Sequence, residues 1–116
     1  MTGIDISKVV RQNINDEGKR FLSDEDMADY INQSVTAIVK DRADSLMAAT
    51  HAVRTITKLA VSATGLSTTI SLDDRWSAAI VAYVEYLAHR RRGNINLYDP
   101  KRANEAALRY AQEIAR

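Results

Sequence analysis

Four stretches of the chain place their apolar residues three or four positions apart, which is the spacing of one helix face. They predict helices near residues 5–16, 24–44, 73–92 and 100–115. Only four Gly and one Pro occur, and we find no linker, internal repeat or low-complexity stretch. The pattern therefore predicts one mainly α-helical, four-helix bundle-like domain over residues 1–116.

The second of these helices has the strongest start signal. Ser23 can cap its first free amides, and the acidic residues 24–26 lie where the helix dipole favours negative charge. Leu22 and Met27 occupy the two positions of a hydrophobic staple. An apolar face follows at Met27, Ala28, Ile31, Val35, Ile38 and Val39.

The third helix has apolar residues almost all round it, which is typical of a helix with more than one neighbour. Ser71 or Asp73 can cap its start, and Gly93 can take the left-handed conformation that ends a helix. Its broad apolar face comprises Trp76, Ala79, Ile80, Tyr83, Val84 and Leu87. We expect this face to pack on Ile31, Val35 and Ile38.

The first and fourth helices are bounded by simpler signals. Gly18 follows the first periodic stretch, where a helix could stop. Asp99 and Pro100 supply a cap and a favoured first residue for the fourth helix. The predicted contact face of that helix is Ala103, Ala107, Tyr110, Ala111 and Ile114.

The segment between the second and third helices, residues 50–72, fits two structures. It is rich in Thr, Val and Ile, and Gly65 separates two such runs, so we favour a β-hairpin or another extended segment. Apolar residues from 46 to 60 also keep helical spacing without a Gly or Pro. A continuous helix to about Val61 therefore stays open.

Composition and charge exclude several classes of protein. Sixteen Lys and Arg oppose fifteen Asp and Glu, so the net charge of +1 creates no strong field for a polyphosphate or an anionic membrane. The absence of cysteine removes disulfides and thiolate metal sites. The longest apolar run, residues 78–84, is too short to cross a bilayer, and the first ten residues do not resemble a secretory signal. We expect a protein that stays in the cytoplasm where it is made, without membrane contact.

The candidates for catalysis and metal binding are weak. The acidic cluster of residues 24–26 and Asp29 lacks the spacing of a calcium loop, and adjacent helical residues point in different directions. His51 and His89 are far apart and have no second histidine one turn away. No nucleophile elbow, phosphate loop or dinucleotide fingerprint occurs. We therefore expect no catalytic residue, no metal ligand and no cofactor, and a chain that is not an enzyme.

A candidate interface lies around the end of the third helix. Arg90, Arg91 and Arg92 can stabilise the negative helix end, or they can contact phosphate or an acidic partner. Tyr86 and Tyr98 fall off the main apolar faces and are candidate interface anchors.

Two segments resemble a known family when they are taken in order. Residues 21–32, FLSDEDMADYIN, resemble the W-x-D-x-E-L-x-x-W-L-N opening of the head-to-tail adaptor (connector) proteins of tailed bacteriophages. Residues 72–88, LDDRWSAAIVAYVEYLA, are similar to the later D-x-[YW]-x-x-A-[IL]-x-x-Y-[VA]-x-x-x-A helix of that family. The alanine-rich ending over residues 99–116 is also similar. The middle of the chain departs from longer members, because it lacks their strand-rich insertion.

The resemblance implies a structural virion protein at the head-tail junction. Such adaptors form a ring with copies of themselves, commonly of twelve subunits, on the portal protein and join it to a tail or nozzle protein. DNA passes through the channel without sequence-specific binding. Arg90, Arg91 and Arg92 would then face a neighbouring subunit or this DNA.

Two hypotheses of other classes compete with the adaptor. One is a small DNA-binding protein of the helix-turn-helix or packaging kind, although the basic residues are dispersed and no short helix pair with a basic second helix stands out. The other is a small enzyme or an enzyme accessory subunit.

Overall fold

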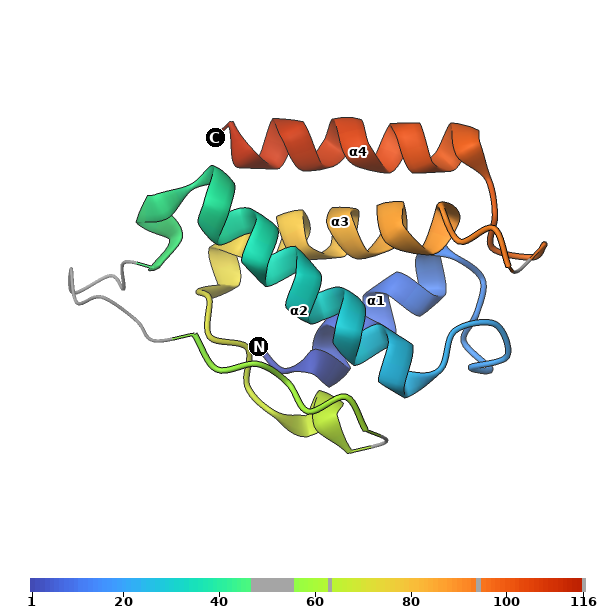
Figure 1. Cartoon of the computed structure of the whole chain (residues 1–116), viewed down its shortest axis with the longest axis horizontal. Coiled ribbons are helices and arrows are strands. Elements are labelled where there is room, and N and C mark those ends of the chain that lie inside the picture. Colours follow the sequence, from blue (N-terminus) through green and yellow to red (C-terminus); the bar gives the residue numbers. More distant parts are fainter. Residues whose placement is uncertain (47–55, 63, 94, 116) are drawn as a thin grey trace.

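The described part of the chain forms four α-helices connected by short 3₁₀ turns and irregular segments (Figure 1). The structure is a computed structural model, and it describes residues 1–46, 56–62, 64–93 and 95–115. The α-helices are α1 (Gly3–Asn13), α2 (Asp24–Asp41), α3 (Ser77–His89) and α4 (Pro100–Ile114), and the 3₁₀ helices are η1 (Ala43–Leu46), η2 (Gly65–Ser67) and η3 (Asp74–Trp76). The prediction of a mainly α-helical, bundle-like fold is confirmed.

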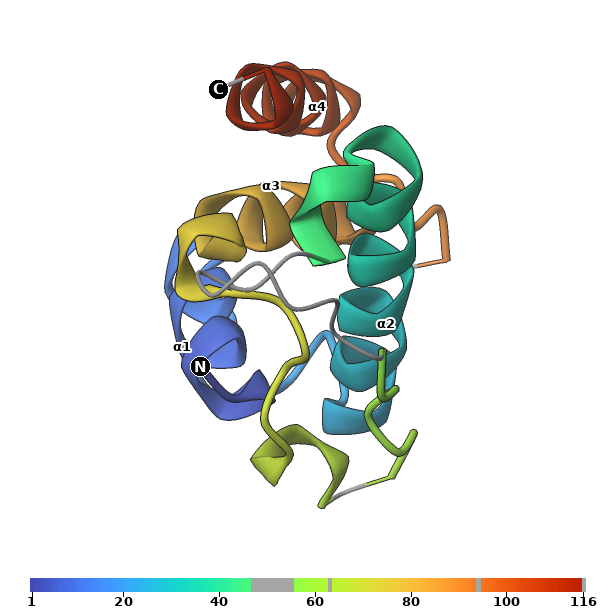
Figure 2. The same ribbon diagram turned by 90° about the vertical axis from the view of Figure 1, so that its left-hand side faces the viewer.

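Helix α3 lies at the centre of the molecule. It packs against α1, α2 and α4, and α4 runs back alongside it in the opposite direction (Figure 1). Seen along the long axis, α4 and α1 lie on opposite sides of α3, and α2 covers a third side (Figure 2). This arrangement explains why the apolar residues of α3 almost encircle it.

The start of α2 agrees with its sequence signals. The Ser23 side chain accepts a hydrogen bond from the Asp26 amide at 3.1 Å, as an N-cap residue does. Leu22 and Met27, at the two staple positions, are both fully buried in the core. The cap and the staple therefore fix the point at which the chain enters α2.

Helix α1 begins and ends earlier than predicted. Thr2 is its N-cap and forms a capping box with Asp5, in which each side chain accepts a hydrogen bond from the other residue's amide. The helix ends at Asn13, so Gly18 does not terminate it. Left-handed backbone instead occurs at Asn15 (φ 58°) and Lys19 (φ 57°). These two residues turn the loop between α1 and α2.

Helix α3 is shorter than predicted at both ends. Its first residues form η3, and the Asp73 side chain makes no capping bond there. Its last residue is His89, and Gly93 does not end it, because no described glycine has a positive φ. The final carbonyls are instead satisfied by the following loop: the Asp99 amide donates to the His89 carbonyl at 3.0 Å.

The described part of the middle segment, residues 56–62 and 64–72, forms neither the favoured hairpin nor the alternative helix. Outside η2 it is extended, which is the other form that the sequence predicted, but it has no strand ladder; the one bridge there joins Thr69 to Thr2. The Asn32 side chain takes the place of a partner strand, since it donates to the Leu59 carbonyl at 2.9 Å and accepts from the Leu59 amide at 2.8 Å. Residues 47–55, which include His51, lie outside the described residues.

Gly65 has a packing role in this segment. A Cβ atom at this position would lie 1.7 Å from the Ala60 carbonyl oxygen. Only glycine permits this close approach of two backbone segments, so Gly65 marks a tight crossing rather than the turn of a hairpin.

The predicted contact of the third helix with the second forms the centre of the core. Trp76, Ile80 and Val84 are buried in one cluster with Ile31, Val35 and Ile38. Tyr83 and Leu87 are only partly buried. On α4 the buried residues are Ala103 and Ala106, while Ala111, which we placed on the contact face, is exposed. Helix α4 is therefore rotated slightly from the predicted orientation.

We predict that Ile80→Ala lowers the free energy of unfolding by about 2–5 kcal/mol, because Ile80 is fully buried and its loss leaves a cavity. Urea denaturation followed by circular dichroism measures this change. The control is Leu108→Ala, which alters a residue that is 61% exposed. A loss of less than about 0.5 kcal/mol for Ile80→Ala would contradict its central position in the core.

Candidate functional site

A buried polar network joins α1, the loop after it and the start of α2. At its centre is Arg11, whose side chain is only 4% exposed. The Arg11 guanidinium donates to the Asp16 carboxylate at 3.0 Å, to the Leu22 carbonyl at 2.7 Å and to the Asp24 carboxylate at 2.9 Å. Its Nε donates to the Ser7 hydroxyl at 3.2 Å. Arg11 is thus a buried charge whose donors are matched by acceptors, as burial requires.

Asp16 organises the loop that Arg11 reaches. Its side chain is fully buried, and its two oxygens accept hydrogen bonds from the amides of Arg20, Phe21 and Leu22 at 2.7–3.0 Å. Three amides and one guanidinium therefore converge on a single carboxylate. This arrangement holds the loop closed, and we assign the network a structural role.

The sequence did not predict this network, because Asp16 and Asp24 follow Arg11 by 5 and 13 residues and this spacing matches no known motif. One signal could have pointed to it. Arg11 directly follows Val10 on the buried face of α1, where an unpaired charge would be costly.

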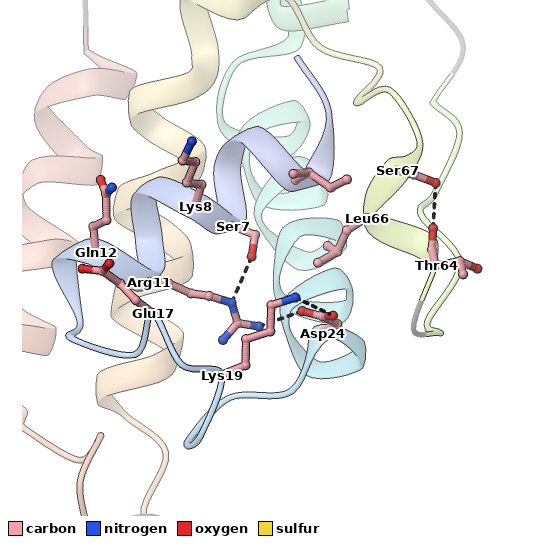
Figure 3. Close-up of a pocket in the computed structure, with 11 residues that line it drawn as sticks. Ser7, Lys8, Arg11, Gln12, Glu17, Lys19, Asp24, Thr64, Leu66 and Ser67 are labelled. Atoms are coloured by element: carbon pink, nitrogen blue, oxygen red, sulfur yellow. Dashed lines mark hydrogen bonds and ion pairs between the residues drawn. The ribbon is translucent and has the colours of Figure 1, made fainter.

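An open pocket of about 560 Å³ lies beside this network (Figure 3). Ile4 and Leu66 supply apolar surface to it, and Lys8 and Lys19 supply cations. Within the part of the chain that the structure describes, no buried polar side-chain atom lining this pocket lacks a partner. Arg11 and Asp24, which line the pocket, already bond to each other.

We predict that Asp16→Ala destabilises the protein by about 3–5 kcal/mol, because it leaves the buried Arg11 charge without its fully buried carboxylate partner. Chemical denaturation measures the effect. The matched control is Glu17→Ala, which removes an exposed carboxylate next in the chain. Equal stabilities for the two variants would show that the network contributes nothing specific.

A second group of polar and aromatic contacts fastens α4 to the rest of the molecule. Tyr110 packs edge-on against Tyr83, with ring centres 5.1 Å apart, and its hydroxyl donates to the Asp41 carboxylate at 2.7 Å. Arg109 pairs at 2.9 Å with Glu85, a carboxylate that is only 3% exposed. The Arg42 guanidinium donates to the Ile114 carbonyl at 2.5 Å. Helix α4 is therefore held at its middle and at its end.

Burial and the bond to Asp41 raise the pKa of the Tyr110 phenol above its ordinary value. The folded state then holds this proton more tightly than the unfolded state, in which a tyrosine has a pKa of about 10. The stabilisation is present below pH ~10 and is lost as the pH rises through the higher folded pKa.

We therefore predict that the stability of the wild type falls above pH ~10 more steeply than that of Tyr110→Phe, which has no phenol to ionise at this position. Denaturation curves collected from pH 8 to 11 measure both slopes. When the absorbance of ionised tyrosine is followed as the pH rises, the variant should lack the component that titrates at the highest pH. If stability falls with pH equally in the wild type and in Tyr110→Phe, Tyr110 has the same pKa in the folded and unfolded states.

The five residues of the predicted interface lie around the end of α3, but they differ in their contacts. Arg90 donates to the Tyr86 hydroxyl at 2.6 Å and lies over the ring of Tyr86, 4.9 Å from its centre. Arg91 pairs with Asp26 at 2.6 Å, and this bond raises the pKa of Arg91. Arg92 is exposed, and Tyr98 is 41% exposed. Arg91 is thus a link between α3 and α2, whereas Arg92 and Tyr98 are accessible.

The structure adds Ile95 to this group. Ile95 is 91% exposed, more than any other large hydrophobic residue in the described part of the chain. We call Arg90, Arg92, Ile95 and Tyr98 the end surface, because the loop that carries most of them forms one end of the molecule (Figure 1). Arginine and tyrosine are enriched at protein interfaces, and Ile95 adds exposed apolar area beside them in the chain.

The remaining candidates have structural contacts. His89 is buried, and its Nδ1 donates to the Leu97 carbonyl at 2.9 Å, which folds the loop back on α3. In the acidic cluster, Asp24 and Asp26 pair with arginines, while Asp29 accepts from Gln33. Among the described residues no three His, Asp or Glu side chains come together as a metal site. No described helix is long and apolar enough to cross a membrane.

Comparisons with known protein families, with curated proteins and with solved structures found no match to this chain.

Proposed function

We propose that this protein is a structural subunit of the head-tail junction of a tailed bacteriophage. Copies of it form a ring on the portal protein and join it to the tail. The observation that carries the proposal is the end surface, where Ile95 and Tyr98 expose apolar area beside Arg90 and Arg92. Burial of this area against a partner supplies free energy, and the arginines supply orientation.

The positions of the two resembling segments support this proposal. Residues 21–32 contain the cap and first half of α2, and residues 72–88 contain η3 and nearly all of α3. These helices pack on each other in the core, and Asp26 and Arg91 pair where α2 starts and α3 ends. The segments that resemble the adaptor family therefore form one structural unit, which presents the end surface.

In this proposal the end surface faces along the ring axis and contacts the portal or the tail protein. DNA passes through the ring without base-specific contact. Carboxylates lie among the cations at this end of the molecule, because Asp26 pairs with Arg91 and the Asp99 amide bonds to the His89 carbonyl, next to Arg90. We therefore expect no sequence-selective binding of duplex DNA.

We predict that the double variant Arg92→Glu/Ile95→Asp no longer joins the portal ring, because it removes the exposed apolar side chain and reverses a charge of the end surface. Electron microscopy of the purified protein mixed with portal detects the ring. Arg91 is left unchanged, since its pairing with Asp26 serves the fold.

The matched control is Ile4→Asp/Lys8→Glu, which alters an exposed isoleucine and an exposed lysine on α1. It should bind portal as the wild type does. If the wild type forms no portal complex but binds duplex DNA tightly and sequence-selectively, the adaptor proposal is wrong and a regulator is favoured.

A further inference from the structure

His89, the last residue of α3, makes two hydrogen bonds to the loop that leads from α3 to α4. Its ring Nδ1 lies 2.9 Å from the Leu97 carbonyl oxygen, and because a carbonyl oxygen can only accept, Nδ1 carries the proton. Its own backbone carbonyl accepts a hydrogen bond from the Asp99 amide at 3.0 Å. His89 therefore holds the loop at two points.

Both hydrogen bonds act on the backbone of Tyr98. The Leu97 carbonyl belongs to the peptide unit that precedes Tyr98, and the Asp99 amide belongs to the peptide unit that follows it. Each peptide unit is planar, so a bond to one of its atoms restricts the orientation of the whole unit. Together the two bonds restrict both backbone torsion angles of Tyr98, and with them the direction of its Cα–Cβ bond.

His89 is a firm support for these bonds, because it belongs to a helix and is buried. It is only 5% exposed, and it lines a hollow of about 300 Å³ together with Asn13 of α1 and Arg102 of α4. Leu97 is buried in the apolar core, whereas the next residue, Tyr98, is 41% exposed. The chain thus passes from an anchored residue directly to an accessible one.

We infer that His89 is a positioning residue for the end surface and fixes the direction of Tyr98 before a partner binds. The inference rests on the proposed function, in which this surface contacts the portal or the tail protein. A tyrosine whose backbone is already restricted loses less conformational entropy on binding, so more of its contact area contributes to affinity. His89 itself is buried and acts through Tyr98 without touching the partner.

The variants His89→Asn and His89→Leu test this role, because their side chains have nearly the same shape. The Asn amide group can take the position of Nδ1 and donate to the Leu97 carbonyl, whereas Leu has no donor. Leu is also the better helix former, so a general loss of helix stability would affect His89→Asn more. Titration of portal with labelled protein should give wild-type affinity for His89→Asn and a dissociation constant raised by about tenfold for His89→Leu.

A double-mutant cycle with Tyr98→Ala separates positioning from general destabilisation. Tyr98→Ala alone should weaken portal binding. In the Tyr98→Ala background, His89→Leu should then change the dissociation constant by less than about twofold, because the residue that it positions is gone. Three results overturn the inference: an undiminished effect of His89→Leu in that background, equal affinities of His89→Asn and His89→Leu, or unchanged portal binding by Tyr98→Ala.

Amide hydrogen exchange of the free protein tests the same role without portal. The Asp99 amide should exchange about tenfold faster in His89→Leu than in His89→Asn, because the loop loses one of its two bonds to His89. If the wild type forms no portal complex, the adaptor proposal fails, and this measurement still decides whether His89 positions Tyr98. Faster exchange in His89→Leu supports the role, and equal exchange overturns it.

If His89→Leu does not fold, His89→Ala takes its place in each of these measurements. Its smaller side chain leaves room for a water molecule at the Leu97 carbonyl, so this buried acceptor keeps a partner while the bond to the ring is lost. The same results then support or overturn the inference.

Discussion

Helix α3 sets the main constraint on this structure, because apolar residues cover most of its circumference. Ala79, Ile80, Ala82, Val84 and Ala88 are all at least 98% buried. A helix of this kind is stable in water only when several neighbours cover it, and here α1, α2 and α4 do so. The positions of these three helices are consequences of that requirement. Helix α4 depends on it most directly, since its buried residues are the two alanines that pack toward α3.

Apolar packing alone does not determine how these helices are oriented. Polar contacts between them fix part of their orientation. The Arg11 network joins α1 to the start of α2, Asn32 holds the extended segment, and Tyr110 positions α4. Each contact is directional, and burial makes the loss of the Arg11–Asp16 pair costly. The loop from Asn15 to Leu22 illustrates the result, because one carboxylate, Asp16, takes the place of regular secondary structure there.

The surfaces left over by this packing are the ones to which we assign function. The end surface lies at one end of the core (Figure 1). In the proposed ring it leaves the sides of the subunit to neighbouring copies, and weak contacts become strong when neighbours are already in place. The Arg91–Asp26 pair ties the end of α3, beside the end surface, to the start of α2.

The sequence by itself determined the number of helices, their approximate positions and the contact between the second and third. Local chemistry explains this, since Ser23, Asp99 and Pro100 act on the helix that they begin. Tertiary structure alone decided the ends of α1 and α3, the lack of strand pairing in the extended middle segment, and the rotation of α4. In two of these cases a partner outside the element replaces the expected local one: Asn32 bonds Leu59 in place of a paired strand, and Asp99 caps the end of α3 in place of Gly93. The Arg11 network and the exposure of Ile95 also depend on such distant contacts, because burial is a property of the packed chain and not of any local pattern.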